Sequence, residues 1–198
     1  MRTIILLNGE PYAGEIDAEG ARVICCDGAY SWAKGRVKID ELIGDFDSLS
    51  NLPEGLAITR YPAEKDMTDG ELSIERSLDM GATEIVIYGG GGLREDHFLG
   101  NLHLLCKAQR AGVRAELVTN FSRIFCAEGR VELNGLKGKT FSIIPFGGEA
   151  HILESGGFQY PLPERFVYGS TRGISNVILE ENAHFTVRGA VLAIVNFD

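Results

Sequence analysis

The chain has 198 residues, which is enough for one large domain or two small ones. Its 44% hydrophobic and 24% charged residues are typical of a globular protein, while a net charge of −9 and a pI near 5.0 disfavour nucleic-acid and anionic-membrane surfaces, which need a basic stripe. No segment approaches the ~18 consecutive apolar residues of a membrane-spanning helix, and residues 1–8 lack the features of a signal peptide. We therefore expect a cytoplasmic protein that binds neither nucleic acid nor membrane.

Strands and helices are predicted to alternate in the first part of the chain. Short runs rich in Ile, Val and Leu predict strands buried on both faces of a sheet, at residues 3–7, 22–26, 41–43, 56–61, 84–88 and 114–119. Helical spacing of apolar residues predicts helices at 68–80 and 98–111, which end at Gly81 and Gly112. This alternation predicts an α/β domain with a mainly parallel, Rossmann-like sheet over residues 1–121.

After Asn120 the pattern changes to short β-type runs separated by glycine-containing turns. The runs lie at residues 123–126, 130–133, 140–145, 150–153, 177–179, 184–187 and 191–197. Such spacing is typical of an antiparallel sandwich or barrel. We therefore predict a second, all-β domain over residues 122–198.

Six aspartates of the first domain follow its predicted strands. They are Asp27, Asp45, Asp47, Asp66, Asp69 and Asp96. Because the carboxyl ends of parallel strands meet at one edge of a sheet, we expect these carboxylates to gather there and to repel one another unless a cation is present. Mg²⁺ held by carboxylates usually accompanies a phosphorylated substrate.

Two acidic motifs carry this prediction. Asp45 and Asp47, separated by one residue, could both reach one metal ion, although an Asx-rich turn explains them equally well. In the second motif, Thr68 and Glu71 have the spacing of a capping box for the helix that follows. A cap leaves Lys65 and Asp66 unexplained, and these residues would suit a phosphate and its metal at a helix N-terminus.

A run of four glycines, residues 89–92, joins a predicted strand to the second helix. Its N–H groups could face a phosphate, and Arg94 could bind the phosphate through two hydrogen bonds. Glycine-rich turns are common, and the chain has neither a Walker-type P-loop nor a convincing dinucleotide fingerprint.

In the second domain, residues 169–176 gather small side chains that can form hydrogen bonds. Ser175 and Asn176 could read the edge of a heterocycle on which Tyr160 stacks. The spacing alone favours a polar loop with a packed tyrosine.

Taken in order, these motifs resemble the thiamine pyrophosphokinase family over nearly the whole chain. The matching segments are residues 27–29, 44–48, 65–71, 89–101 and 173–176. The resemblance implies ATP-dependent transfer of a pyrophosphoryl group to the hydroxyethyl oxygen of thiamine, with release of AMP and a need for Mg²⁺. It also implies an N-terminal α/β nucleotide domain, a C-terminal β-sandwich, and a homodimer whose active sites combine the first domain of one subunit with the second domain of the other.

The resemblance implies a role for each site residue. The metal ligands would be Asp45, Asp47, Asp66 and Asp69. The catalytic groups would be Asp47, Asp69, Lys65 and Arg94, with Lys65 and Arg94 on phosphates and Asp69 as the candidate general base. The nucleotide and its metal would be bound by Asp27, Gly28, Asp66, Thr68, Gly91, Gly92, Asp96, His97 and Asn101. Thiamine would be bound by Tyr160, Arg172, Ser175 and Asn176.

The sequence departs from the family pattern at Leu93, where a glycine is usual, and at Tyr160, which stands where some members have tryptophan. Two other classes of function remain open from the residues: an Asp-based phosphohydrolase using Asp45 and Asp47, and a non-catalytic module that binds thiamine or a nucleotide.

Overall fold

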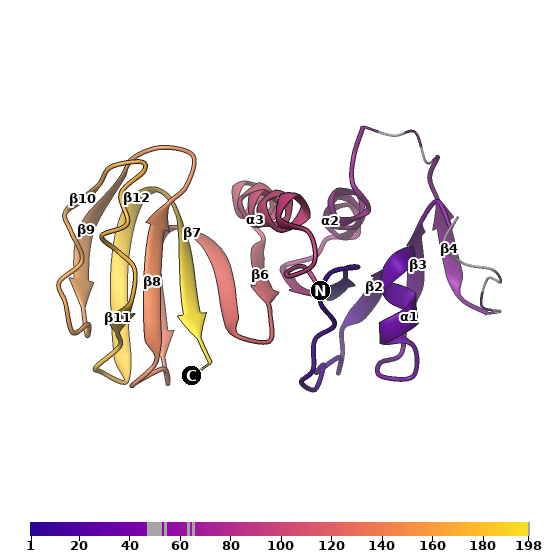
Figure 1. Ribbon diagram of the computed structural model, residues 1–198, viewed down its shortest axis with the longest axis horizontal. Helices are drawn as coiled ribbons and strands as arrows, with labels where there is room; N and C mark the ends of the chain where they lie inside the picture. Colours follow the sequence, from indigo (N-terminus) through magenta and orange to yellow (C-terminus); the bar gives the residue numbers. More distant parts are fainter. Residues whose placement is uncertain (47–52, 54, 63, 65, 198) are drawn as a thin grey trace. The chain divides into compact units, whose positions relative to one another are not determined.

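The computed structural model describes residues 1–46, 53, 55–62, 64 and 66–197 (Figure 1). The chain forms two compact units, Met1–Asn120 and Phe121–Asp198. The structure is mostly strand, with parallel pairings in unit 1, antiparallel pairings in unit 2 and few helices. No helix of the described part is long and apolar enough to cross a membrane.

Six strands form the sheet of unit 1, within two residues of the positions that the sequence predicts. They are β1 (Arg2–Leu6), β2 (Arg22–Cys26), β3 (Glu41–Gly44), β4 (Ala57–Arg60), β5 (Glu84–Tyr88) and β6 (Arg114–Val118). Neighbouring strands pair in parallel in the order β6-β5-β1-β2-β3-β4, so the carboxyl ends of all six strands lie at one edge.

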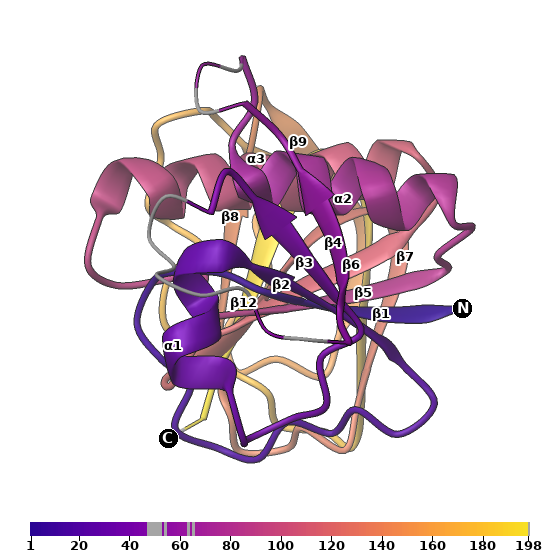
Figure 2. The ribbon, with the colours of Figure 1, turned by 90° about the vertical axis from the view of Figure 1, so that its right-hand side faces the viewer.

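Helices cover both faces of this sheet. Helices α2 (Asp69–Asp79) and α3 (Glu95–Arg110) lie side by side over one face, and the short η1 (Asp27–Ala29) and α1 (Tyr30–Ala33) cover the other (Figure 2). The side chains of β2 alternate accordingly: Ile24 packs with Leu72 of α2, whereas Val23 packs in the cluster of Ala33. The sequence pattern predicts neither η1 nor α1, because elements this short show no helical period.

In unit 2 one long strand, β12 (Asn182–Asn196), organises the sheet. It pairs along its length with β7 (Ser122–Asn134), and on its other side with β9 (Ala150–Gly156) and then β8 (Thr140–Pro145). The short strands β10 (Arg165–Phe166) and β11 (Asn176–Val177) extend β9 and β8, and all these pairings are antiparallel. The sequence pattern predicts two runs in place of β7 and two in place of β12, whereas each is one strand that passes through a glycine of positive φ, Gly129 or Gly189.

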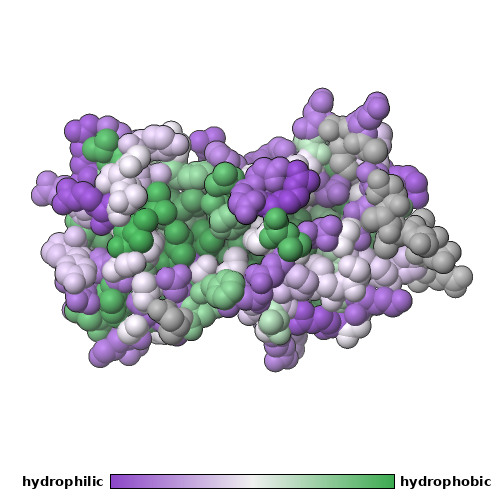
Figure 3. Space-filling model, viewed as in Figure 1, coloured by the Kyte–Doolittle hydropathy of each residue, from purple (hydrophilic) through white to green (hydrophobic). Residues whose placement is uncertain are grey.

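One hydrophobic cluster forms the core of unit 2. Phe141, Phe166 and Phe185 are almost completely buried there, and the Phe141 and Phe185 rings lie 6.0 Å apart. The surface of unit 2 also carries exposed apolar side chains, and Figure 3 shows a green apolar region where Figure 1 places β8. The large apolar residues exposed in this unit include Leu153, Tyr160, Val167, Tyr168, Ile174 and Leu179.

A buried carboxylate ties together the elements of unit 1 near β4. Glu41, at the start of β3, is only 1% exposed, and it accepts hydrogen bonds from Arg22 (2.8 Å) and Thr59 (2.7 Å). Arg76 of α2 donates from Nε at 3.0 Å. Burial acts to raise the pKa of the Glu41 carboxyl, but these hydrogen bonds outweigh it and lower the pKa below the ordinary 4.5.

Replacing this carboxylate should destabilise the protein in a pH-dependent way. We expect Glu41→Gln to lower the free energy of unfolding by about 1–3 kcal/mol at neutral pH, since it removes charged hydrogen bonds from a buried site. A carboxyl with a lowered folded pKa stabilises fully above its unfolded pKa, and this contribution disappears as the pH falls through the folded value. Urea unfolding should therefore show a difference from wild type that narrows below pH 4.5.

Glu84→Gln is the matched control, because Glu84 starts β5 and pairs with Arg114, whose side chain is 74% exposed. This exposed pair should contribute less than about 1 kcal/mol. The account would be contradicted if the two variants lost the same free energy of unfolding, or if the loss in Glu41→Gln did not change with pH.

Candidate active site

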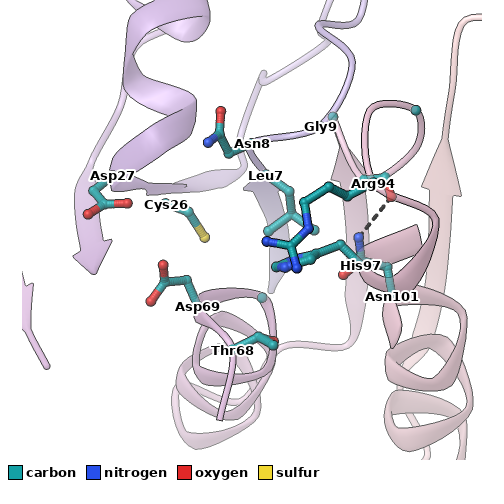
Figure 4. Close-up of a pocket in the computed structure, with 14 residues that line it drawn as sticks. Leu7, Asn8, Gly9, Cys26, Asp27, Thr68, Asp69, Arg94, His97 and Asn101 are labelled. Carbon is teal, nitrogen blue, oxygen red and sulfur yellow. Dashed lines mark hydrogen bonds between the residues drawn. The ribbon is translucent and has the colours of Figure 1, made fainter. Parts of the chain in front are cut away.

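A cavity of about 200 Å³ lies at the carboxyl edge of the sheet of unit 1 (Figure 4). It is formed by the segments that follow β1, β2 and β5 and by the N-terminal ends of α2 and α3. The lining residues are Leu7, Asn8, Gly9, Cys26, Asp27, Thr68, Asp69, Gly70, Gly89, Gly90, Gly92, Arg94, His97 and Asn101. Open parallel sheets bind their ligands at this edge.

Asp27 forms one end of the cavity and is only 8% exposed. Its carboxylate accepts hydrogen bonds from the backbone N–H of Phe46 at 2.9 Å and of Gly28 at 2.5 Å. A Cβ at residue 44 would lie 2.6 Å from the Asp27 Cγ, so glycine at this position makes room for the carboxylate. The motif around Asp45 thus begins with a glycine because Asp27 occupies the adjacent space.

Negative charge accumulates at this end of the cavity. Burial raises the pKa of the Asp27 carboxyl, and the nearby charges of Asp69 and Asp45 raise it further, against the hydrogen bonds from Phe46 and Gly28. Figure 4 shows the carboxylates of Asp27 and Asp69 on the same side of the cavity. A site that disfavours its own ionised carboxylates in this way favours a cation.

The structure describes only part of the acidic set. Within the described ranges, no three His, Cys, Asp or Glu side chains are arranged to hold a metal ion. Asp47 and Lys65, which the sequence analysis assigns to metal and phosphate, lie outside the described residues.

Helix α2 begins at the cavity with a side-chain cap. Thr68 is extended and its hydroxyl accepts a hydrogen bond from the Glu71 N–H at 3.1 Å, as the capping motif predicts. The Glu71 side chain does not complete the capping box, because it forms an ion pair of 2.8 Å with Lys107 of α3. This pair links the two helices whose N-terminal ends line the cavity.

The glycine loop and α3 form another wall. The Asn101 side chain donates a 2.8 Å hydrogen bond to the Gly90 carbonyl, which fastens the loop to the helix. Helix α3 begins at Glu95 rather than at the predicted residue 98, because two acidic residues favour its first turn. Arg94, its N-cap, is held by Asp96 through bonds of 3.1 and 2.6 Å, and these hydrogen bonds lower the pKa of Asp96 to about 2.

Unit 2 contains a separate cavity of about 200 Å³, lined by Tyr160, Pro161, Leu162, Pro163, Arg172, Gly173, Ile174 and Asn176. Asn176 is buried, and its side chain accepts from the Tyr160 N–H at 3.0 Å and donates to the Tyr160 carbonyl at 2.7 Å. It thereby fixes the backbone that carries the exposed Tyr160 ring. A Cβ at residue 173 would overlap the Ile143 carbonyl, which explains the glycine of this motif.

Comparison with known proteins assigns the chain to a family. The protein-family model described as "Thiamin pyrophosphokinase, catalytic domain" matches residues 17–117. A second family model, described as "Thiamin pyrophosphokinase, vitamin B1 binding domain", matches residues 129–192. The thiamine pyrophosphokinase of Bacillus subtilis is 32% identical over 164 residues, which cover 78% of this chain and 77% of that protein.

The chain belongs to the thiamin pyrophosphokinase family. Its fold matches the B. subtilis thiamine pyrophosphokinase structure with a TM-score of 0.87 at 26% identity, over 100% of both chains. It matches the Geobacillus thermodenitrificans enzyme with a TM-score of 0.85 at 25% identity, over 100% of this chain and 98% of that one. The Candida albicans enzyme shares the fold at 15% identity, with a TM-score of 0.79 over 99% of this chain and 90% of that one. The family and the ATP-dependent pyrophosphotransferase activity expected from the motifs are thus confirmed.

The structure brings many of the residues predicted for the pyrophosphokinase site to one cavity. Those that line it are Asp27, Thr68, Asp69, Gly92, Arg94, His97 and Asn101. The described residues Gly28, Asp45, Asp66, Gly91 and Asp96 do not line it. In unit 2, Tyr160, Arg172 and Asn176 line the second cavity and Ser175 does not.

Sequence reasoning missed part of the lining, most clearly Asn8, Gly9 and Cys26. The pair Asn8-Gly9 follows the first strand, so the rule that identified the aspartates also applies to it. Cys26 gives no such signal, since it is the last residue of an apolar strand.

Removing the cap of α2 should weaken the fold near the cavity. We expect Thr68→Ala to lower the free energy of unfolding by about 1 kcal/mol, because the Glu71 N–H loses its acceptor. Thr68→Ser keeps the hydroxyl and should stay near wild type in the same denaturant titration. Equal stability of Thr68→Ala and wild type would show that this cap does not stabilise α2.

Proposed function

We propose that the cavity of unit 1 binds ATP with Mg²⁺ and that the cavity of unit 2 binds thiamine. The observation that carries the first assignment is the meeting of Asp27, Asp69, Arg94 and a glycine loop around one cavity in a chain of this family. The expected domains are a Rossmann-like nucleotide domain over residues 1–121 and a thiamine-binding β-sandwich over 122–198. A cytoplasmic location accords with a metabolic kinase of this kind.

The phosphates of ATP would lie against the glycine loop and the beginnings of α2 and α3. Helix N-termini carry partial positive charge and N–H groups without helical partners, which suits phosphate oxygens. Arg94 would bind phosphate with the guanidinium that Asp96 orients, and Lys65 would add a second positive charge. His97, Asn101, Gly91 and Gly92 would complete the nucleotide side, and Gly28 would hold Asp27 in place.

The carboxylates at the other end of the cavity would hold a divalent metal ion together with Asp47, which lies outside the described residues. Burial and the charges of Asp69 and Asp45 raise the pKa of Asp27. This raised pKa supports a cation site, because a bound cation would reduce the repulsion between the carboxylates. Oxygen donors are the ligands that Mg²⁺ prefers. We assign the metal to Asp45, Asp47, Asp66 and Asp69. When bound, Mg²⁺ would neutralise charge on the phosphate oxygens.

The proposed reaction needs positioning more than a covalent nucleophile. The hydroxyethyl oxygen of thiamine attacks the β-phosphorus of ATP, the new O–P bond forms, and the bond from the β-phosphorus to the oxygen it shares with the α-phosphate breaks. AMP leaves with that oxygen, and the hydroxyl proton passes to a base, for which Asp69 is our candidate. Arg94 and Lys65 would hold the transferred phosphates.

The thiamine half of the proposal rests on the second cavity. Tyr160 would stack on the pyrimidine, and Asn176 would act by fixing the Tyr160 backbone. Ser175 and Arg172 would complete the contacts. Thiamine is a cation, and the net charge of −9 attracts it to this protein.

We also propose a homodimer in which each active site uses the nucleotide cavity of one subunit and the thiamine cavity of another. The exposed apolar side chains of unit 2, among them Tyr168 and Ile174, support an interface on this unit.

The assay for this function uses ATP, Mg²⁺ and thiamine, and we expect equal amounts of thiamine diphosphate and AMP. Asp69→Asn should lower kcat about 100-fold or more, because the side chain keeps its shape and loses the charge at the reacting end of the cavity. Inorganic phosphate as the product would instead indicate the phosphohydrolase, and no turnover the binding module.

Asp79→Asn is the matched control, since Asp79 is exposed at the opposite end of the same helix. It makes the same chemical change away from the cavity and should leave kcat unchanged. A kcat of Asp69→Asn near that of wild type at limiting Mg²⁺ would overturn the role of Asp69.

A further inference from the structure

One wall of the nucleotide cavity is a ribbon made by two segments that continue β1 and β5 beyond the sheet. Backbone hydrogen bonds pair them: Leu7 N–H to the Tyr88 carbonyl (2.9 Å), Gly9 N–H to the Gly89 carbonyl (2.7 Å) and Glu10 N–H to the Gly91 carbonyl (2.7 Å). Most of the residues of this ribbon line the cavity: Leu7, Asn8, Gly9, Gly89, Gly90 and Gly92. The position of the glycine loop therefore depends on this pairing.

Trp32 of α1 packs against the ribbon. Its indole Nε1–H donates a 3.1 Å hydrogen bond to the Leu7 carbonyl. Gly89 has a φ of +69°, and a Cβ there would lie 2.9 Å from the Trp32 Cζ2. The ring thus occupies the space beside Gly89 that a side chain would need, and it touches both segments of the ribbon.

Arg36 and Asn120 hold the chain that continues from the ribbon. The Arg36 guanidinium lies 5.9 Å from the centre of the Trp32 ring and donates to the carbonyls of Tyr12 and, at 2.8 Å, Gly14. The Asn120 side chain accepts from the Ala13 N–H at 2.7 Å. The chain that follows the ribbon is therefore held in place, and it could not move to restore the ribbon if the contacts of Trp32 were lost.

We propose that Trp32 is a positioning residue for ATP binding. It acts through the Leu7 carbonyl and Gly89, which set the place of the glycine loop, and it does not line the cavity itself. The sequence pattern predicts no functional role for this residue, which is the only tryptophan of the chain. The inference rests on the proposed function in one respect, namely that the cavity of unit 1 binds the nucleotide.

Trp32→Phe tests the proposal, because it keeps an aromatic ring and removes the N–H donor. We expect the KM for ATP to rise about 3- to 10-fold, the effect of one lost hydrogen bond, with kcat and the KM for thiamine near wild type. Hydrogen exchange of the ligand-free protein should show faster exchange at the Gly9 and Glu10 amides, whose bonds pair the ribbon, and unchanged exchange in α3.

Tyr30→Phe is the matched control: it removes a polar group from another aromatic residue of α1 and should change neither quantity. An unchanged KM for ATP in Trp32→Phe would overturn the proposal even if the variant were less stable or its ribbon exchanged faster. A wild-type protein that forms no AMP would instead refute the proposed function. In that case unchanged exchange at Gly9 and Glu10 would still overturn the role of Trp32 in the ribbon, and faster exchange there would support it.

Discussion

Unit 1 brings several carboxylates together at the carboxyl edge of its parallel sheet. The site depends on how the repulsion between these carboxylates is offset. Six parallel strands end at the same edge, and the carboxylates of Asp27, Asp45 and Asp69 come close enough there to raise the pKa of the buried Asp27. A fold can keep such a cluster only if hydrogen bonds and cations offset it. Two backbone N–H groups donate hydrogen bonds that stabilise the Asp27 carboxylate. A metal ion with its phosphates would supply the remaining stabilisation. The chemistry assigned to the cavity is thus also what relieves its electrostatic cost.

The remaining parts of unit 1 hold the groups of this edge in place. Asn101 fastens the glycine loop to α3, and Lys107 joins α3 to α2 through Glu71. On the side of β4, Glu41 joins α2 to three strands through Arg76, Arg22 and Thr59, with a carboxylate that stays ionised although it is buried. The Asn101–Gly90 bond lies at the cavity wall, whereas the other contacts lie outside the cavity and hold α2 and α3 to each other and to the strands. Unit 2 uses the same principle when Asn176 fixes the backbone of Tyr160.

The sequence predicted the strands of unit 1 well, because short apolar runs and their turn residues are local signals, and it predicted that Asp27, Asp69 and Arg94 would meet. It could not predict contacts that only tertiary packing creates. The spacing of Thr68 and Glu71 predicted the hydrogen bond of the cap. It could not predict that the Glu71 side chain would form an ion pair with Lys107 instead of completing the capping box. Asn176 was expected to face a ligand, whereas the hydrogen bonds described for its side chain go to backbone. Trp32 gave no signal, because its partners are a carbonyl and a glycine distant in sequence.

We propose that the Asp27 end of the cavity is a cation site, and the Asp27 carboxyl reports on it directly. Its pKa can be followed by ¹³C NMR in the protein with and without Mg²⁺, with the exposed Asp17, which pairs with Arg2, as an internal control. Without metal the Asp27 pKa should lie above its ordinary 3.8. Mg²⁺ should lower it, because a bound cation favours the ionised carboxylate, and should leave Asp17 unchanged. An Asp27 pKa that does not respond to saturating Mg²⁺, or that shifts only as much as Asp17, would contradict the account.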